Sequence, residues 1–298
     1  MNTASRPVPV AWVVGAGYLG SRLHELLLGG GWDSRRVDLE PSRADVRADA
    51  AEASALRRAG LPRPDCVFSC VSTAGGGADA YERLYVGVAA SLRVCCGGAR
   101  VVFCSSSSVY GASDASWVTE ESPCRPSTRR GAVLLKAEEE VRRAGGVVAR
   151  LCALYGPKRS CAVLRYLRGG DILAGDDDRW INHIHRDDAA AALLHLALTA
   201  PPGSTWNVAD GSPMQKGQML SLLLESTGLP LPSGGARPYR RGVSNQRVSS
   251  EKLRASGWLP VYPRFACALE EVLRSFAALP DAEDDGFGAG ASAWFRGK

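Results

Sequence analysis

Residues 10–20 of this chain read Val10-Ala11-Trp12-Val13-Val14-Gly15-Ala16-Gly17-Tyr18-Leu19-Gly20. The first five residues are apolar and predict a buried strand, and the leucines from residue 19 onward are spaced as on one face of a helix. A G-x-G-x-x-G motif between a strand and a helix indicates a turn that binds a dinucleotide. Gly15 permits the tight turn, Gly17 lets the backbone approach a pyrophosphate, and Gly20 lets the helix pack closely on the strand. The N-terminus of that helix adds partial positive charge and free N–H donors.

An acidic residue, Asp38, follows the last glycine by the spacing expected of the residue that binds the adenosine ribose. Such a carboxylate accepts hydrogen bonds from the ribose hydroxyls and repels a 2′-phosphate, so the sequence predicts NAD rather than NADP. Two alternatives remain open: Asp38 could be a solvated turn residue, and nearby arginines could pair with a 2′-phosphate. These arginines are Arg35, Arg36 and Arg43. We expect the cofactor to contact Gly15, Gly17, Tyr18, Leu19, Gly20 and Asp38.

Length and composition restrict the class of protein. A chain of 298 residues can form one large α/β domain, or one domain with a small lobe. No apolar run approaches the roughly 18 residues of a membrane span, and residues 1–9 are too short and too proline-rich for a signal peptide. The net charge of +5 is scattered rather than clustered, so we expect a cytoplasmic protein that binds neither a membrane nor nucleic acid. The nine cysteines include no C-x-x-C pair, which predicts reduced core thiols and no metal site.

Short apolar runs alternate with helical patterns through the first half of the chain. We expect strands at residues 10–14, 36–39, 66–71, 101–104 and 147–151, and helices at residues 19–28, 81–96, about 131–143, and 187–198. Apolarity that is continuous along each strand indicates burial on both faces. The sequence therefore predicts an α/β fold with a Rossmann-like doubly wound parallel sheet and a small C-terminal substrate lobe.

The pattern changes after Arg150, where glycine, proline and aspartate become frequent. We expect residues 8–150 and 183–210 to form the NAD-binding core and residues 151–182 and 211–279 to form the substrate-binding lobe. Residues 280–298 combine acidic and small residues and are expected to form a mobile tail.

The run Ser105-Ser106-Ser107-Ser108-Val109-Tyr110-Gly111 directly follows the strand expected at residues 101–104. Ligands of open α/β sheets bind at the carboxyl ends of the strands, so these hydroxyls are directed at the cofactor crevice. With the glycine motif, this run makes the chain resemble the atypical or extended short-chain dehydrogenases/reductases, the NAD-dependent epimerase/dehydratase group. The other matches, in family order up to about residue 275, are Asp38, Asp45-Val46, Arg150, Tyr155-Gly156-Pro157 and Ile184-His185-Arg186-Asp187-Asp188.

The resemblance implies roles for particular residues. Asp45 and Val46 would lie beside the adenine, and Tyr155 would contact the cofactor. Ser106 falls where the family places the hydroxyl that hydrogen-bonds the reacting oxygen, although a serine run could also simply cap a turn. Ser107, Asn182 and His183 are expected on the substrate side. His185 is expected to anchor the helix that begins near Asp187 rather than to take part in chemistry.

The chain departs from the family at its acid/base pair. The family carries Tyr-x-x-x-Lys, in which the tyrosine exchanges the proton and the lysine lowers its pKa. If Lys136 is the motif lysine, the tyrosine position holds Ala132; if Glu138 sets the register, the two positions hold Arg130 and Leu134. Neither register supplies a tyrosine. In addition, Ala153 replaces an asparagine that binds nucleotide-sugar substrates in the family, which weakens the case for such a substrate.

Three functions are compatible with these residues. The first is an NAD-dependent oxidoreductase that acts on a carbonyl or alcohol of a small metabolite, with Ser106 polarising the reacting oxygen. Its proton donor is non-standard, and the candidates are Tyr110, Lys136, Tyr155 and His183. The second is an epimerase or dehydratase with tightly bound NAD. The third is a non-catalytic dinucleotide-binding sensor or scaffold. The resemblance also allows a homodimer that pairs through helices such as residues 81–96 and 131–143.

Overall fold

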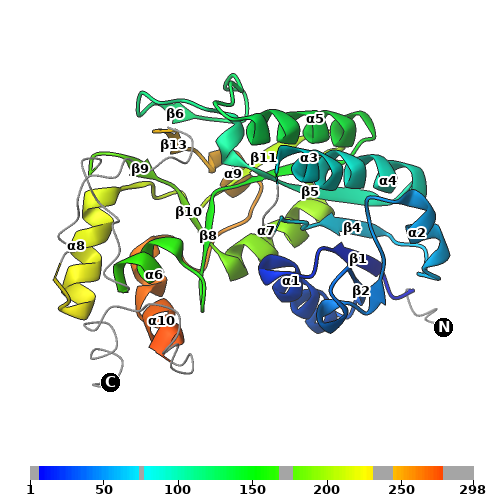
Figure 1. The fold of residues 1–298 in the computed structure, drawn as a ribbon, viewed down its shortest axis with the longest axis horizontal. Helices are drawn as coiled ribbons and strands as arrows, with labels where there is room; N and C mark the ends of the chain where they lie inside the picture. The colour runs from blue at the N-terminus through cyan, green and yellow to red at the C-terminus, as the bar shows by residue number, and fades with distance from the viewer. Residues whose placement is uncertain (1–6, 74–76, 168–176, 231–243, 278–298) are drawn as a thin grey trace, which may run out of the picture.

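The computed structural model describes residues 7–73, 77–167, 177–230 and 244–277. The tail expected at residues 280–298 lies outside these ranges. The centre of the molecule is a seven-stranded sheet in the order β11-β7-β5-β4-β1-β2-β3, and every neighbouring pair runs parallel (Figure 1). Its strands are β1 (Val10–Val14), β2 (Asp33–Asp38), β3 (Val46–Arg47), β4 (Cys66–Ser69), β5 (Arg100–Ser106), β7 (Val147–Leu151) and β11 (Thr205–Val208).

Helices cover both faces of this sheet (Figure 1). On one face α1 (Tyr18–Gly29) packs against α7 (Arg186–Thr199). The helices of the other face are α2 (Ala53–Arg58), α3 (Ala78–Glu82), α4 (Val88–Cys95) and α5 (Arg129–Arg143). Every residue of β4 and β7 is buried, because each strand has helices above and below it. The predicted Rossmann-like doubly wound fold is confirmed.

The chain leaves β1 in one direction to build β2 and β3, and then returns to build β4 and β5 on the other side of β1. The crevice between β1 and β4 at the carboxyl edge is therefore the topological switch point of the sheet, where open α/β folds bind their ligands. The glycine turn that follows β1 lies at this edge.

Some elements differ from the expected ones. Strand β2 begins at Asp33, three residues early, because its first three residues, although polar, pair in parallel with Val10, Ala11 and Trp12 of β1. The helix expected at residues 81–96 is divided into α3 and α4 by a π-helical turn, η2 (Arg83–Gly87). The strand expected at residues 66–71 ends at Ser69.

Short pieces of secondary structure join segments that are distant in sequence. The pairs are β6 (Trp117–Val118) with β13 (Arg247–Val248), β8 (Ala153–Tyr155) with β10 (His183–His185), and β9 (Trp180–Ile181) with β12 (Met214–Gln215). The remaining short elements are the 3-10 turns η1 (Pro41–Arg43) and η3 (Ser107–Val109) and the helix α9 (Glu251–Ala255).

A second hydrophobic cluster lies apart from the core of the sheet. Its helices are α6 (Cys161–Leu167), α8 (Lys216–Thr227) and α10 (Phe265–Ala277), which gather at one end of the molecule in Figure 1. Val163, Leu223 and Val272 are fully buried within it. The residues of this cluster all come from the part of the chain beyond β7.

The described residues contain no membrane-spanning helix, metal-binding cluster or disulfide. None of the helices there is long and apolar enough to cross a membrane. No group of three or more His, Cys, Asp or Glu side chains in these ranges is arranged to hold a metal ion. All nine cysteines lie within the described ranges, and none of them forms a disulfide.

Candidate active site

The glycine turn requires glycine at two of its three motif positions. Gly15 has a φ of +89°, and a Cβ atom there would lie 2.7 Å from the backbone nitrogen of Val71. A Cβ atom on Gly20 would collide with the carbonyl oxygen of Gly15. In contrast, a Cβ atom on Gly17 would meet no atom within 4 Å, so this side of the turn is open. Gly17 is also the N-cap of α1 and has no side chain to cap the first amides, which fits a pyrophosphate bound at the helix N-terminus.

Asp38 is held against the glycine turn. One carboxylate oxygen accepts a hydrogen bond from the backbone N–H of Ala16 at 2.7 Å, and the other accepts from Glu40 at 3.0 Å. The carboxylate thus lies at the carboxyl end of β2, beside the open turn. This arrangement of glycine cradle, helix N-terminus and acidic group fits an adenosine dinucleotide without a 2′-phosphate.

Two of the three nearby arginines are engaged with other carboxylates. Arg35 forms an ion pair with Asp33 at 2.7 Å, and Arg36 forms one with Asp45 at 2.7 Å. The third, Arg43, is exposed at the end of η1.

A pocket of about 360 Å³ opens beyond Asp38, at the carboxyl ends of β2 and β3. Its lining residues are Leu39, Arg47, Ala48, Asp49, Ala55, Arg58 and Ala59. The expected adenine residues Asp45 and Val46 are not among them. Asp45 precedes β3, at the amino end of that strand, and its pairing with Arg36 holds its pKa below the ordinary value.

The carboxylate that lines this pocket is Asp49, which sequence reasoning missed. It accepts a hydrogen bond from the N–H of Ala51 at 3.0 Å and pairs with Arg83 of the π-helical turn. The order of residues in the sequence favours Asp49, because Asp49 follows β3 whereas Asp45 precedes it. Ligands of such sheets bind at the carboxyl ends of the strands.

The serine run lies at the end of β5, as expected. Ser106 is the last residue of this strand and is half-buried, and its Oγ accepts a hydrogen bond from the N–H of Ser108 at 3.2 Å. That contact caps η3 and leaves the hydroxyl proton of Ser106 unused. Ser107 begins η3, and its carbonyl accepts a hydrogen bond from the amide of Gln246 at 2.9 Å.

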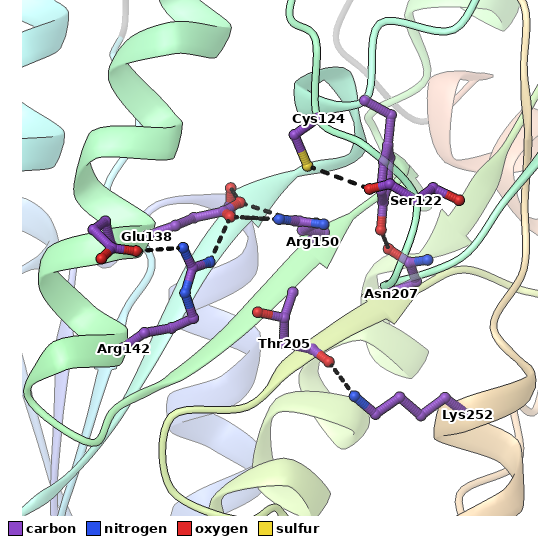
Figure 2. A network of polar contacts seen from close by, with 11 residues as sticks. Ser122, Cys124, Glu138, Arg142, Arg150, Thr205, Asn207 and Lys252 are labelled. Carbon is purple, nitrogen blue, oxygen red and sulfur yellow. Dashed lines mark hydrogen bonds and ion pairs between the residues drawn. The ribbon is translucent and has the colours of Figure 1, made fainter.

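Glu138 and Arg150 form a buried ion pair beneath this run (Figure 2). Glu138 has no exposed surface, and its carboxylate accepts from Arg150 at 2.7 Å and from the hydroxyl of Ser105 at 2.6 Å. Arg142, one turn further along α5, reaches the same carboxylate at 3.2 Å. This network determines which face of α5 is buried.

Two predicted catalytic residues have partners elsewhere in the described chain. Lys136 lies on the outer face of α5 because Glu138 turns the opposite face inward; its side chain is 63% exposed and pairs with Glu82 at 2.9 Å. Tyr110 is buried in the core, where its hydroxyl donates to Asn207 at 2.6 Å and burial raises its pKa to about 12. Arg150 lies over its ring at 4.8 Å. Tyr110 therefore contributes to core packing and links the end of η3 to β11.

Tyr18 and Tyr155 join the glycine turn to the second cluster. The hydroxyl of Tyr18 donates to the carbonyl of Pro157 at 3.0 Å, and Arg186 lies over its ring at 4.9 Å. Tyr155 packs on Phe265 with ring centroids 4.9 Å apart and is almost completely buried. Burial raises the pKa of Tyr155 far above its ordinary value, so this phenol stays protonated.

The predicted substrate-side residues have structural partners. The amide of Asn182 donates to the carbonyl of Gln246 at 2.9 Å and accepts from the N–H of Val248 at 2.7 Å, so it holds β13 in place. His183 is buried, and burial lowers its pKa to about 4. The expected anchoring of α7 by His185 is confirmed, because its Nδ1 accepts from the N–H of Asp187 at 3.3 Å and caps this helix.

Sequence reasoning also missed Asp210, two residues beyond the end of β11 at the carboxyl edge. One carboxylate oxygen accepts from the N–H of Ser212 at 2.8 Å, while the other is buried without a partner in the described chain. Burial raises the pKa of this carboxyl to about 7. Its negative charge in turn contributes to the raised pKa values of Tyr155 and Cys152. The signal in the sequence was an acidic residue just after a core strand.

Comparisons with known proteins agree with this geometry. The sequence model of the NAD-dependent epimerase/dehydratase family matches residues 11–209. The chain is 31% identical over 169 residues to the 2'-dehydrokanamycin reductase of Streptomyces kanamyceticus. This match covers 51% of the chain and 45% of that protein, so the chain spans about half the length of this curated relative.

Solved structures share the fold. The UDP-glucose 4-epimerase of Thermotoga maritima superposes with a TM-score of 0.78 at 19% identity, covering 90% of this chain and 98% of that one. The dTDP-glucose 4,6-dehydratase DesIV of Streptomyces venezuelae, solved with NAD, superposes with a TM-score of 0.78 at 22% identity, covering 91% and 97%. Since the family match extends over more than half of the sequence and the glycine turn fits the dinucleotide, the chain belongs to the NAD-dependent epimerase/dehydratase family.

Proposed function

We propose that this protein is an oxidoreductase that uses NAD to interconvert a carbonyl and an alcohol on a small metabolite. The observation that carries the proposal is the placement of Ser106. Its hydroxyl lies at the carboxyl end of β5, next to the β1–β4 crevice, and its orientation is fixed by the N–H of Ser108. A positioned donor at this edge serves a reacting oxygen, whereas a protein that only binds dinucleotide has no need of one.

The backbone of residues 15–20 would hold the pyrophosphate and Asp38 the adenosine ribose. We propose that Asp49, rather than Asp45, lies beside the adenine, because it lines the pocket beyond the ribose position. When bound, NAD supplies or accepts the hydride. The protein's own contribution is to orient the substrate oxygen and to stabilise the charge that develops on it.

Ser106 would donate its free hydroxyl proton in a hydrogen bond to the oxygen that gains negative charge. A donor of this kind in a water-poor site typically accounts for about 10²–10³ in kcat. The carbonyl carbon gains the hydride, the oxygen gains a proton, and the product is an alcohol.

The substrate class follows from two observations. The curated relative is named 2'-dehydrokanamycin reductase. In this chain Ala153 stands where nucleotide-sugar enzymes of the NAD-dependent epimerase/dehydratase group carry asparagine. We propose a ring ketone of a sugar-like molecule that carries no nucleotide. The second cluster, around α6, α8 and α10, would form the core of the lobe that binds it.

The test is reduction of ketones by NADH. Purified protein is incubated with NADH or NADPH and with 2'-dehydrokanamycin, 3-dehydroglucose or cyclohexanone, and cofactor oxidation is followed by absorbance. We expect turnover with at least one sugar ketone. Ser106→Ala should lower kcat about 10²–10³-fold, Ser106→Thr should restore part of it, and Ser108→Ala should leave it unchanged.

Two results would favour the other functions. If denaturation releases stoichiometric NAD and no ketone consumes NADH, an epimerase or dehydratase with tightly bound NAD is the better description. If the protein binds NADH and Ser106→Ala changes no property, the sensor or scaffold function is favoured.

A further inference from the structure

We propose that Tyr81 of α3 is the proton donor of this site, with Tyr85 and Arg130 as the residues that position it. This inference rests on the oxidoreductase function proposed above. In this arrangement the acid/base tyrosine has moved from α5 to the neighbouring helix, and α5 contributes a cation in its place.

The buried Glu138 sets the register of α5. Residues four and eight positions before it, Leu134 and Arg130, lie successively nearer the start of the helix on the same face. Leu134 is buried at 2% exposure, and Arg130 lies at the carboxyl edge of the sheet, where α5 begins. Under this register these two residues occupy the Lys and Tyr positions of the family's pair, so neither can serve as its acid.

Arg130 points toward a pair of tyrosines on the adjacent helix. Its guanidinium carbon lies 5.7 Å from the centroid of the Tyr81 ring. Tyr81 and Tyr85 are one turn apart, with ring centroids 4.4 Å apart, and Tyr85 meets Phe103 of β5 edge-on at 6.2 Å. A continuous series of contacts therefore runs from the strand that carries Ser106 to Arg130.

Element geometry carries both Tyr81 and Ser106 toward the same edge of the sheet, starting from the contact between Tyr85 and Phe103. Ser106 lies three residues beyond Phe103, or about 10 Å further along the strand. Tyr81 lies four residues before Tyr85, or about 6 Å along the helix. Because a crossover helix runs opposite to the parallel strands that it joins, both displacements lead toward the carboxyl edge. We infer that the length of the Tyr81 side chain makes up the remaining few ångströms.

The segment around Tyr81 is distinguished in two further ways. The π-helical turn η2 begins two residues after it, and single π-helical turns inside helices occur often at functional sites. Two ion pairs also fasten α3 to α5, namely Lys136 with Glu82 and Arg129 with Asp79, both at 2.9 Å. The exposed Lys136 thus takes part in the contact between α3, which carries Tyr81, and α5, which carries Arg130.

The charges around the two phenols assign their roles. Burial raises the pKa of Tyr81, while a hydrogen bond from Tyr85 and the positive charge of Arg130 oppose that rise. Burial raises the pKa of Tyr85 further, and the neighbouring Tyr81 and Cys104 add to the rise. Arg130 thus opposes the effect of burial at Tyr81, and both phenols are protonated at neutral pH.

A protonated phenol can donate to the oxygen that Ser106 polarises. The O–H bond of Tyr81 breaks as a new O–H bond forms on the reduced oxygen. The resulting phenolate is stabilised by the hydroxyl of Tyr85 and by Arg130, and it recovers a proton from water. When bound, NADH would supply the hydride, and this two-electron donor balances the reduction.

The experiment measures ketone reduction, using whichever of the three ketones above the parent protein reduces fastest, over a range of pH. Tyr81→Phe should lower kcat about 10²–10⁴-fold, with KM and the Kd for NADH unchanged. Arg130→Ala and Tyr85→Phe should both move the alkaline limb of the kcat profile to higher pH, and Arg130→Lys should restore it. Tyr262→Phe, which removes an exposed hydroxyl paired with Glu271, is the matched control and should behave like the parent.

A second readout does not depend on turnover. Tyrosinate absorbance is titrated in the parent and in Tyr81→Phe, and the difference gives the titration of Tyr81. Arg130→Ala should shift this titration to higher pH. Parent-like rates and pH profile in Tyr81→Phe, or an unshifted titration in Arg130→Ala, would overturn this inference and leave the proposed function standing. Failure of the parent to reduce any of the three ketones would overturn both.

Discussion

Asp210 places a carboxyl group where water cannot reach one of its oxygens. In the unfolded chain this carboxyl has an ordinary pKa near 3.8, and in the folded protein burial raises the pKa to about 7. Between these two values the folded state holds a proton that the unfolded state has released. The free energy of unfolding therefore falls as pH rises from about 4 to 7.

Replacing the carboxyl with an amide tests this directly. Asp210→Asn keeps the oxygen that accepts from Ser212 and should remove that part of the pH dependence, as measured by urea unfolding at several pH values. Burial lowers the pKa of His183 to about 4, so this residue makes the free energy of unfolding rise with pH over much of the same range. The comparison therefore uses the difference between variant and parent. Asp178→Asn, at an exposed position, is the control. Parallel curves for the parent and Asp210→Asn would contradict the assigned pKa.

At the scale of elements, α5 is held to β5 and β7 by the buried pair of Glu138 and Arg150 (Figure 2). Glu138→Ala leaves the guanidinium of Arg150 buried without its partner, and such losses cost about 3–5 kcal/mol. We expect a decrease of this size in the free energy of unfolding, measured with urea. Glu139→Ala removes a surface partner of Arg142 and Arg143 and should cost no more than about 1 kcal/mol. Equal costs for the two variants would show that the network contributes little.

The same helix shows what the sequence could and could not predict. The strands and helices of the sheet were predictable because continuous apolar runs and the glycine motif are local signals. The inward face of α5 was not, because it depends on Arg150, a residue on the following strand. For that reason the sequence left two registers open and placed Lys136 in the site. The π-helical turn between α3 and α4 left no trace in the spacing of apolar residues.

The candidate site residues also divide into those that local sequence specifies and those that depend on distant parts of the chain. Gly15, Gly20 and Asp38 all belong to the consecutive segment formed by β1, the glycine turn, α1 and β2, and the structure places them together. Asp45 and Asp49 could be separated only by knowing where β3 begins and ends. Asn182 and Asp210 depend on contacts with segments from other parts of the chain, and no local pattern reveals such contacts.

At the scale of the whole molecule, the site lies where the carboxyl edge of the sheet meets the second hydrophobic cluster. Tyr18 links the glycine turn to Pro157, and Asn182 links β10 to β13. Arg247 of β13 lies between the rings of Trp117 and Trp180, at 5.1 and 5.2 Å from their centroids. A dinucleotide held by the glycine turn would therefore touch an edge to which both clusters are fastened, and its binding should stabilise the folded chain as a unit.

Cofactor binding can be measured as stability. A ligand that binds only the folded state at 100 times its Kd adds about 2.7 kcal/mol to the free energy of unfolding. At equal concentrations, NADH should raise the melting temperature of the parent more than NADPH, because the Asp38 carboxylate repels a 2′-phosphate. Asp38→Ala should narrow or reverse this difference, since removal of the charge also leaves Arg43 free to meet the phosphate. Asp33→Ala, which releases Arg35 at the far end of β2, should preserve the preference for NADH. If NADPH stabilises the parent as much as NADH does, Asp38 does not bind the ribose.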